Sequence, residues 1–563
     1  MSKPIAYIVF ITTAIFFALF FLWPILTTVQ EAFVDDGHFT FDFVRHIFVD
    51  PLYIEGLFNA FLIATYSTLA ALCIAMPLAL VSNRYIFPGK TLFGSLVLVP
   101  LILPPFVGAI GIKQILGQEG ALNILLSRIG AVDMSAPPDW LGEGRFWGIV
   151  IMNALHLYPI LYLNITAALA NLDPAMEESA QNLGASPWRR FRRITLPLSM
   201  PGVFAGATIV FIWSFTELGV PLMFDYQRVT SVQIFNGIKD IGGNPMPYAL
   251  VAVMLTFSVI LYIAGKYFFG RSNFTMTGRA AISTKQRQAS PLVGVLCSGL
   301  FACVISLAIF PHIGVILMSF ATDWYHSMFP QSFTLRHYSD ALGHELTVPS
   351  IANSLKYASI STLVDIVLGI AIAFVIVRSK IPGRGILDAL SMLPLAVPGL
   401  VMAFGYLAMT REGQPFHFLL PAGNPTILLV IAYAVRRLPY VVRSAVAGFQ
   451  QTSVDLEEAA QNLGATPFRA LRRITIPLIT ANLIAGGLLA FAFAMLEVSD
   501  SLILAQQQPH YPITKAIYTL FGSLGNGHSL ASALGVWSMA FLAITIMGAS
   551  LALGKKLGAL FRV

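Results

Sequence analysis

The chain contains two near-copies of one segment, which read EESAQNLGASPWRRFRRITLPL at residues 177–198 and EEAAQNLGATPFRALRRITIPL at residues 457–478. Most of the aligned positions are identical, and the copies lie 280 residues apart. Chance does not produce two matches of this length, so the chain carries an internal duplication.

The duplication extends beyond this segment. The same offset relates Glu217 to Glu497, and an offset of 294 relates the run that begins at Asn59 to the run that begins at Asn353. The sequence therefore predicts three parts, which are a first repeat at 1–270, a linker at 271–290 and a second repeat at 291–563.

The composition excludes a water-soluble globule. Of the 563 residues, 56% are hydrophobic and 11% are charged, whereas about 25% are charged in an ordinary soluble domain. Three cysteines are too few for a disulfide scaffold. The net charge of +7 would favour nucleic acid as the partner of a soluble protein, but in so apolar a chain it indicates membrane orientation. We expect an all-α membrane protein that contacts lipid and no nucleic acid.

The apolar runs are long enough to cross a membrane. A hydrocarbon core requires roughly 20 apolar residues in a helix, and twelve runs meet this length. They cover residues 4–28, 56–82, 91–115, 146–170, 195–224, 248–269, 292–320, 350–378, 386–409, 425–448, 475–505 and 530–554. Six runs fall in each repeat, and an even number returns the chain to the same side, so the repeats are predicted to be parallel.

Every second loop between these runs is basic, as with Arg84 and Lys90 or the tail that holds Lys555 and Lys556. The intervening loops are mixed or acidic. Because lysine and arginine accumulate on the cytoplasmic side of a membrane, the basic loops and both termini are predicted to be cytoplasmic. Both copies of the repeated segment lie in such loops.

The repeated segment carries the signals of two short helices joined by a bend. Asp173-Pro174 is a helix start, and Leu183-Gly184 is a left-handed helix end. Ser186-Pro187 and Thr466-Pro467 then offer a new cap and a first-turn proline. An interfacial helix that anchors the loop among lipid head groups is one interpretation, but lipid anchoring does not explain why the acidic half is duplicated.

The repeated segment resembles the E-A-A, G, I-x-L-P loop of binding-protein-dependent ABC importer permeases. The first copy supplies Glu178-Ser179-Ala180, Gly184 and Ile194-Thr195-Leu196-Pro197, and the second copy departs only by Ile476 in place of leucine. The resemblance implies the type I importer permease fold, with two permease units fused in one chain. It also implies a multi-pass protein of the bacterial inner membrane that is not an enzyme.

In that family the loop forms a coupling helix that docks on an ATP-binding subunit. The resemblance thus implies two copies of an ATP-binding subunit, which hold ATP and Mg, and an extracytoplasmic solute-binding protein. We expect Glu178 and Glu458 to orient the bend through charge-assisted hydrogen bonds and Gly184 and Gly464 to permit it. The predicted coupling residues are Glu177, Glu178, Ala180, Leu183, Gly184, Ala185, Glu457, Glu458, Ala460, Leu463, Gly464 and Ala465.

Ionisable residues inside the apolar runs are candidates for function, because they are costly in a membrane. The predicted translocation pathway or gate residues are Glu217, Glu497, Asp500, Arg436 and Arg437. Two interpretations stay open for each sign of charge. The glutamates face the pathway or bond to hydroxyls and free backbone near a helix break, and the arginines pair with carboxylates or attract an anionic substrate. No metal ligand set is assigned.

The chain lacks a phosphate loop, since Gly89-Lys90-Thr91 is preceded by Arg84 where the motif requires glycine. No cofactor is therefore expected in this chain.

The predicted function is an ABC importer permease for a small polar solute, with ferric iron favoured. An oxyanion such as a phosphonate, thiamine or a polyamine is the alternative cargo. A transporter driven by an ion gradient is the alternative from a different class.

Overall fold

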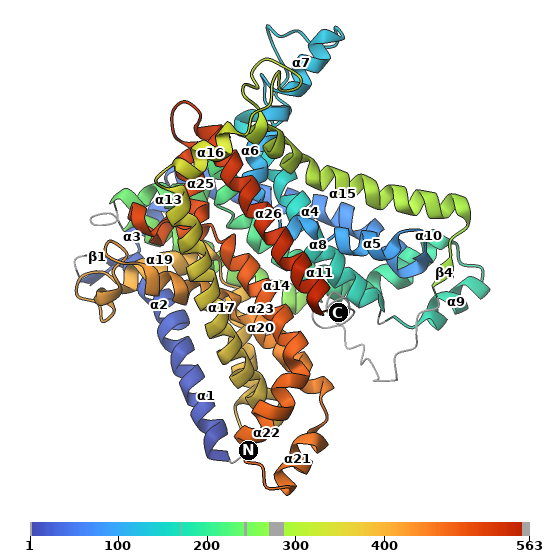
Figure 1. Ribbon diagram of the computed structural model, residues 1–563, viewed down its shortest axis with the longest axis vertical. Helices are drawn as coiled ribbons and strands as arrows, with labels where there is room; N and C mark the ends of the chain where they lie inside the picture. The colour runs from blue at the N-terminus through green and yellow to red at the C-terminus, as the bar shows by residue number, and fades with distance from the viewer. Residues whose placement is uncertain (1–2, 36, 171, 241–244, 270–285, 554–563) are drawn as a thin grey trace. The chain divides into compact units, whose positions relative to one another are not determined.

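A computed structural model describes residues 3–35, 37–170, 172–240, 245–269 and 286–553, and most of the predicted linker 271–290 lies outside these ranges. The chain forms two compact units. The N-half unit contains Pro51–Val232 and Thr256–Leu335, and the C-half unit contains Met1–Asp50, Gln233–Leu255 and Arg336–Arg562. Helices make up nearly all of the regular structure in both units (Figure 1).

The N-half unit consists of ten α-helices, three shorter helical turns and two strands among the described residues. They are α4 (Pro51–Arg84), α5 (Lys90–Leu96), η2 (Val99–Leu101), α6 (Pro105–Leu116), α7 (Ala121–Arg128), η3 (Glu143–Arg145), α8 (Phe146–Ala170), α9 (Pro174–Asn182), α10 (Pro187–Arg190), η4 (Phe191–Thr195), α11 (Leu196–Phe215), α12 (Gly219–Met223) and α15 (Pro291–Phe320), with β3 (Tyr85–Ile86) parallel to β4 (Arg287–Gln288). Its core includes Ala75 of α4, Leu161 of α8 and Phe301 of α15.

The C-half unit has the same kinds of element. They are α1 (Lys3–Phe17), η1 (Ala18–Leu22), α2 (Trp23–Phe33), β1 (Val34–Asp35) antiparallel to β2 (His38–Phe39), α3 (Asp42–Ile47), η5 (Gly237–Asp240), α16 (Arg336–Gly343), α17 (Thr347–Arg378), α18 (Arg384–Met392), η6 (Leu393–Leu395), α19 (Gly399–Met409), η7 (His417–Leu419), α20 (Thr426–Gln451), α21 (Val454–Asn462), α22 (Pro467–Ala470), η8 (Leu471–Thr475), α23 (Ile476–Met495), α24 (Ser499–Leu504), η9 (Gln508–His510), α25 (Ile513–Phe521) and α26 (Gly527–Leu553). The helices α13 (Thr230–Asn236) and α14 (Met246–Phe269) contain residues of both units.

The first long helix of each sequence half belongs to the unit built mainly by the other half. In the N-half unit α15 packs on α6, and in the C-half unit α2 packs on α19 and α1 runs beside α17 (Figure 1). One glycine makes each of the two close crossings possible. A Cβ atom at Gly111 of α6 would lie 2.0 Å from the carbonyl oxygen of Pro311, and one at Gly405 of α19 would lie 2.6 Å from that of Pro24. The two glycines are 294 residues apart, so the duplication includes this crossing.

Within the described residues, nine helices are long and apolar enough to cross a membrane, or up to eleven if each of two bent pairs is one span. The predicted number of twelve stays a prediction, as does the cytoplasmic placement of both termini. The predicted span at 425–448 coincides with α20, which is long enough but carries Arg436, Arg437 and Arg443 and is therefore less apolar than the counted helices.

Two predicted spans are not straight. The segment 91–115 is bent by 92° between η2 and α6, and the segment 386–409 is bent by 101° between η6 and α19. Pro104 and Pro398 stand at these bends with ψ of 120° and 140°. Proline has no N–H to donate to a helical hydrogen bond, so both positions suit an interrupted helix, while Pro311 inside α15 shows that one proline alone does not break a helix. The apolar pattern alone does not show this break.

Candidate functional site

Each copy of the repeated segment forms a helix, a glycine bend and a second helix, and we call this unit an elbow. In the first elbow, residues 173–196, Asp173 accepts a hydrogen bond from the Ala175 amide at 2.9 Å and begins α9. Ser186 accepts from the Arg189 amide at 3.3 Å and begins α10. These caps confirm the helix starts that the sequence predicted.

The bend of the first elbow is a left-handed helix end. Gly184 has a φ of +78°, which is costly for any residue with a Cβ atom. The Gly184 amide donates to the Gln181 carbonyl and the Ala185 amide donates to the Ala180 carbonyl, both at 2.9 Å. These two bonds form a Schellman motif, which satisfies carbonyls that the end of a helix leaves free. Three of the predicted coupling residues, Ala180, Gly184 and Ala185, therefore fix the shape of the bend.

The second elbow, residues 453–476, repeats this geometry. Ser453 and Thr466 cap its two helices, accepting from the amides of Asp455 and Arg469. Gly464 has a φ of +87°. The equivalent bonds of the bend run from Gly464 to Gln461 at 2.9 Å and from Ala465 to Ala460 at 3.0 Å.

Large apolar side chains are exposed at the tip of each elbow. Leu183 is 87% exposed and Leu463 is 91% exposed, and the aromatic residues Trp188 and Phe468 are 68% and 71% exposed. Apolar side chains that gather on a surface mark a contact with another molecule or a membrane. Each elbow therefore exposes one large aliphatic and one large aromatic side chain at equivalent positions.

A buried or half-buried glutamate ties each elbow to its unit. Glu177 accepts hydrogen bonds from Arg84 at 3.0 Å and from Thr195. In the second elbow Glu457 accepts from Arg378 at 3.0 Å and from Thr475 at 2.9 Å. These are charge-assisted bonds, which are shorter and stronger than neutral ones.

The sequence predicted that Glu178 and Glu458 orient the bend, and the structure gives these bonds to the preceding glutamates instead. Glu178 and Glu458 are exposed. The reason is helical geometry, since adjacent residues of a helix point about 100° apart and only one of each pair faces the long helix. The carboxylates of Glu178 and Glu458 are thus available to another molecule.

The arginine partners were missed in the sequence. Arg84 and Arg378 end the long helices α4 and α17, far in sequence from the glutamates they bind. A signal for them was present, because these two arginines are separated by the same 294 residues as Asn59 and Asn353. The sequence also gave no sign of the short π-helical turns η4 and η8 that follow α10 and α22.

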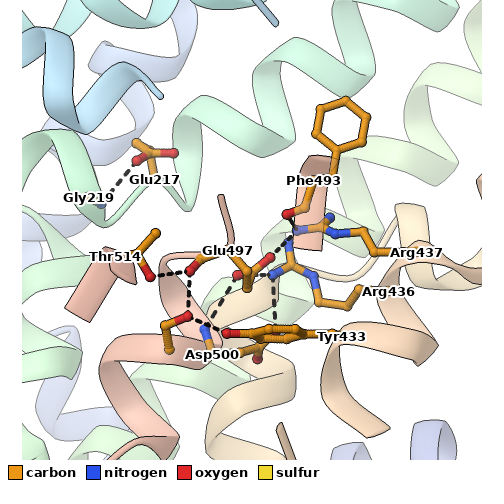
Figure 2. Close-up of polar contacts among 10 residues, drawn as sticks. Glu217, Gly219, Tyr433, Arg436, Arg437, Phe493, Glu497, Asp500 and Thr514 are labelled. Atoms are coloured by element: carbon orange, nitrogen blue, oxygen red, sulfur yellow. Dashed lines mark hydrogen bonds and ion pairs between the residues drawn. The ribbon is translucent and has the colours of Figure 1, made fainter. Parts of the chain in front are cut away.

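The four predicted pathway or gate residues of the C-half unit, which are Arg436, Arg437, Glu497 and Asp500, form one cluster (Figure 2). Arg436 donates to Glu497 at 2.6 Å and to Asp500 at 3.4 Å. Arg437 forms an ion pair with Glu497 and donates to the Phe493 carbonyl at 3.1 Å. Side-chain exposure is 12% or less throughout the cluster. Of the two interpretations of the arginines, pairing with carboxylates is confirmed.

Both intramembrane glutamates lie where a helix breaks. The carboxylate of Glu217 accepts from the backbone amides of Gly219 and Val220 at 3.0 and 3.2 Å, at the start of α12 (Figure 2). The Glu497 carboxylate lies 3.4 Å from the Asp500 amide, at the start of α24. The interpretation that these glutamates bond to free backbone is therefore confirmed for both, and their place on a translocation pathway stays a prediction.

At both breaks a hydroxyl side chain also donates a hydrogen bond to the backbone carbonyl of the glutamate. Ser231 donates to the carbonyl of Glu217 and Thr514 donates to the carbonyl of Glu497, each at 2.7 Å. The charges beside them differ, because the positions of Arg436 and Arg437 are His156 and Leu157 in the first repeat. His156 hydrogen-bonds the Pro100 carbonyl at 2.7 Å. Across the described ranges, no three His, Cys, Asp or Glu residues group as metal ligands would.

Comparison with known proteins identifies relatives over most of the chain. The putative ferric transport system permease protein FbpB 1 of Haemophilus influenzae is 28% identical over 517 residues, which are 89% of this chain and 78% of the relative. The ferric transport system permease protein FbpB of Actinobacillus pleuropneumoniae is 28% identical over 508 residues, 88% of this chain and 69% of the relative. The putative 2-aminoethylphosphonate transport system permease protein PhnU of Salmonella choleraesuis is 26% identical over 251 residues, 44% of this chain and 87% of the relative.

The family described as "Binding-protein-dependent transport system inner membrane component" matches residues 71–274 and 365–553. The two matched ranges make up more than half of the chain, and each includes one elbow. The predicted resemblance is therefore confirmed, and with it the prediction that the chain is not an enzyme. This all-helical, multi-pass membrane protein belongs to the binding-protein-dependent transport permease family of ABC importers.

Proposed function

We propose that the two elbows are the surfaces on which two ATP-binding subunits dock, and that this chain forms the whole membrane passage of the importer. The observation that carries the proposal is the matched pair of exposed apolar tips, with Leu183 and Leu463 each about nine-tenths exposed. A lipid anchor tolerates many amphipathic sequences, whereas both tips share one rigid bend and one exposed glutamate. A shaped protein groove is the partner that such a fixed form suits.

In the proposed cycle, ATP and Mg bind to the partner subunits and draw them together. Each elbow moves with its subunit, and the two halves rock so that access switches from the outside to the cytoplasm. The caps and the Schellman bonds keep each elbow rigid, because a loose loop would absorb the motion. An extracytoplasmic solute-binding protein delivers the solute on the outer side of the bacterial inner membrane.

We propose ferric iron as the first candidate cargo, because the relatives that cover most of this chain are named as ferric transport permeases. An oxyanion such as a phosphonate is the alternative, supported by the relative named for 2-aminoethylphosphonate; thiamine and polyamines follow. Arg436 and Arg437 form ion pairs with Glu497 and Asp500. This pairing favours a role for the cluster as part of a gate, with selectivity supplied by the binding protein.

Docking is tested with single cysteines at the tips, Leu183→Cys and Leu463→Cys, after Cys73, Cys297 and Cys303 are replaced by serine. A matched control is Leu524→Cys, which is 98% exposed on a loop predicted to be outer. In membranes that contain the ATP-binding subunits, both tip cysteines should crosslink to those subunits and the control should not. Crosslinks only to lipid, or equal crosslinking from Leu524→Cys, would overturn the proposed docking.

Cargo is tested separately, by uptake into liposomes that hold this chain, the ATP-binding subunits and the solute-binding protein. Labelled ferric iron and labelled 2-aminoethylphosphonate are supplied in turn, with and without ATP. Uptake of iron alone, and only with ATP, supports the first candidate. Uptake of the phosphonate alone replaces it, and uptake that persists without ATP contradicts the ATP-driven mechanism.

A further inference from the structure

The same three-residue contact occurs in both elbows, and each joins three separate segments. Arg84 at the end of α4, Glu177 of α9 and Thr195 of η4 meet in the first elbow. In the second, Arg378 at the end of α17, Glu457 of α21 and Thr475 of η8 meet in the same way. We call each trio a strut. Each strut links a long membrane helix, the first elbow helix and the turn that leads into the next long helix.

We propose that the struts carry motion from each elbow into its unit, and that Arg84 and Arg378 are positioning residues for coupling. This inference rests on the proposed function of the elbows as docking surfaces. A hydrogen-bonded arginine and carboxylate fix both distance and direction. Without a strut, the backbone and side-chain packing would be the remaining connections between the elbow and α4 or α17.

The two adjacent glutamates of each elbow then have different tasks. Glu177 and Glu457 point inward and hold the strut. Glu178 and Glu458 are exposed, on the side that a docked subunit would contact. Replacing the inner glutamate should therefore affect transmission of motion, and replacing the outer one should affect docking.

The second strut is the more deeply buried of the two. The side chains of Arg378 and Glu457 are 8% and 10% exposed, whereas those of Arg84 and Glu177 are 36% and 29% exposed. Arg378 also donates to the Thr452 carbonyl at 2.8 Å and lies 5.6 Å from the centre of the Phe449 ring. Water screens an exposed pair, while a buried arginine that loses its partner is strongly disfavoured.

From this difference we infer that the halves are unequal in coupling and that the C-half strut is the more sensitive. Removing Arg378 leaves a buried glutamate without its cation. Removing Arg84 leaves a glutamate that water can reach. The loss of coupling should therefore be large in the first case and small in the second.

The test uses the full chain in liposomes with the ATP-binding subunits and the solute-binding protein, and measures solute imported per ATP hydrolysed. We expect Arg378→Gln to lower this ratio about tenfold or more, because a buried ion pair is broken. We expect Arg84→Gln to lower it by no more than about threefold, because exposed pairs contribute little. Arg378→Lys, which keeps the positive charge, should recover part of the loss.

A milder pair of variants covers the case in which Arg378→Gln does not fold. Thr475→Val and Thr195→Val each remove one donor to the strut and keep the shape of the side chain. Thr475→Val should lower import per ATP by about threefold, because a buried carboxylate loses one hydrogen bond. Thr195→Val should lower it less.

The outcomes separate this inference from the docking proposal. If the Leu463→Cys crosslink forms in the Arg378→Gln background and import per ATP stays normal, the proposed role of the strut in coupling is wrong and the docking proposal is kept. Equal losses in Arg84→Gln and Arg378→Gln would overturn the inequality, and a folded Arg378→Lys no better than Arg378→Gln would overturn the charge contact. If the tip cysteines never crosslink to an ATP-binding subunit, docking itself is wrong.

Discussion

Substitution of Gly464 tests whether backbone geometry at the bend of the second elbow sets coupling. Gly464 has a φ of +87°, and a Cβ atom there would meet no atom within 4 Å. Alanine at this position therefore costs backbone strain without an internal clash. That strain is roughly 1–2 kcal/mol for an ordinary L-residue, and asparagine tolerates this backbone better.

The strain acts on the two hydrogen bonds that close the bend. A cost of 1–2 kcal/mol corresponds to a factor of about 5–30 in the balance between the closed and the opened bend. The amide of Ala465, which donates to Ala460, should exchange with solvent faster by about this factor in Gly464→Ala. Solute imported per ATP should fall in the order wild type, Gly464→Asn, Gly464→Ala, Gly464→Val.

Two measurements check this expectation, which are hydrogen exchange of the Ala465 amide in the full chain and import per ATP in liposomes. Gly413→Ala is the matched control, because Gly413 has a φ of +84° and open space around it in a loop predicted to be outer. The reasoning is refuted if the Ala465 amide exchanges no faster in Gly464→Ala than in the wild type. It is also refuted if this amide exchanges faster and import per ATP is unchanged. An equal loss in Gly413→Ala would also refute it.

Three further predictions concern stability. Gly405→Leu should destabilise the purified chain by about 1–3 kcal/mol, since its Cβ would press on backbone atoms of α2 and overpacked sites cost this much; thermal unfolding checks this, and Gly385→Leu, where a Cβ meets nothing within 4 Å, should unfold like wild type. Glu497→Gln should cost about 3–5 kcal/mol because two buried arginines lose their shared carboxylate, and an unchanged unfolding temperature would contradict it. Asn353→Leu removes the side-chain bonds to the 509–511 loop and should cost about 1–3 kcal/mol, seen as faster hydrogen exchange in that loop.

The elbows could be predicted from the sequence because the forces that shape them are local. Asp173 before proline, glycine after Leu183, and Ser186 before proline each act within one helical turn. The structure places a cap or a left-handed bend at each of these positions. The duplication repeats the glycine and the second helix start at Gly464 and Thr466-Pro467, whereas Ser453-Val454 stands where the first copy has Asp173-Pro174.

The contacts that hold the elbows in place could not be predicted in the same way. The partner of Glu177 is an arginine 93 residues earlier, and a sequence does not say which of two adjacent glutamates faces it. The bends at Pro104 and Pro398 were missed for a related reason, since hydropathy records how apolar a run is and not whether its backbone continues. In both cases the packing of distant segments decides which glutamate faces the arginine and whether the helix bends, and the local sequence permits either result.

The two halves have kept the elbow and have diverged in their intramembrane charges. Both have the left-handed glycine, the capped helices and the strut. The C-half unit also has two arginines in α20 that bond to Glu497 at the break between α23 and α24, and the first repeat has His156 and Leu157 at the positions of these arginines. The arginine cluster is present once, and its bonds join α20 to the end of α23 and the start of α24. We therefore expect it to act within the C-half unit, and the coupling to the ATP-binding subunits to depend on the elbows and struts that both halves share.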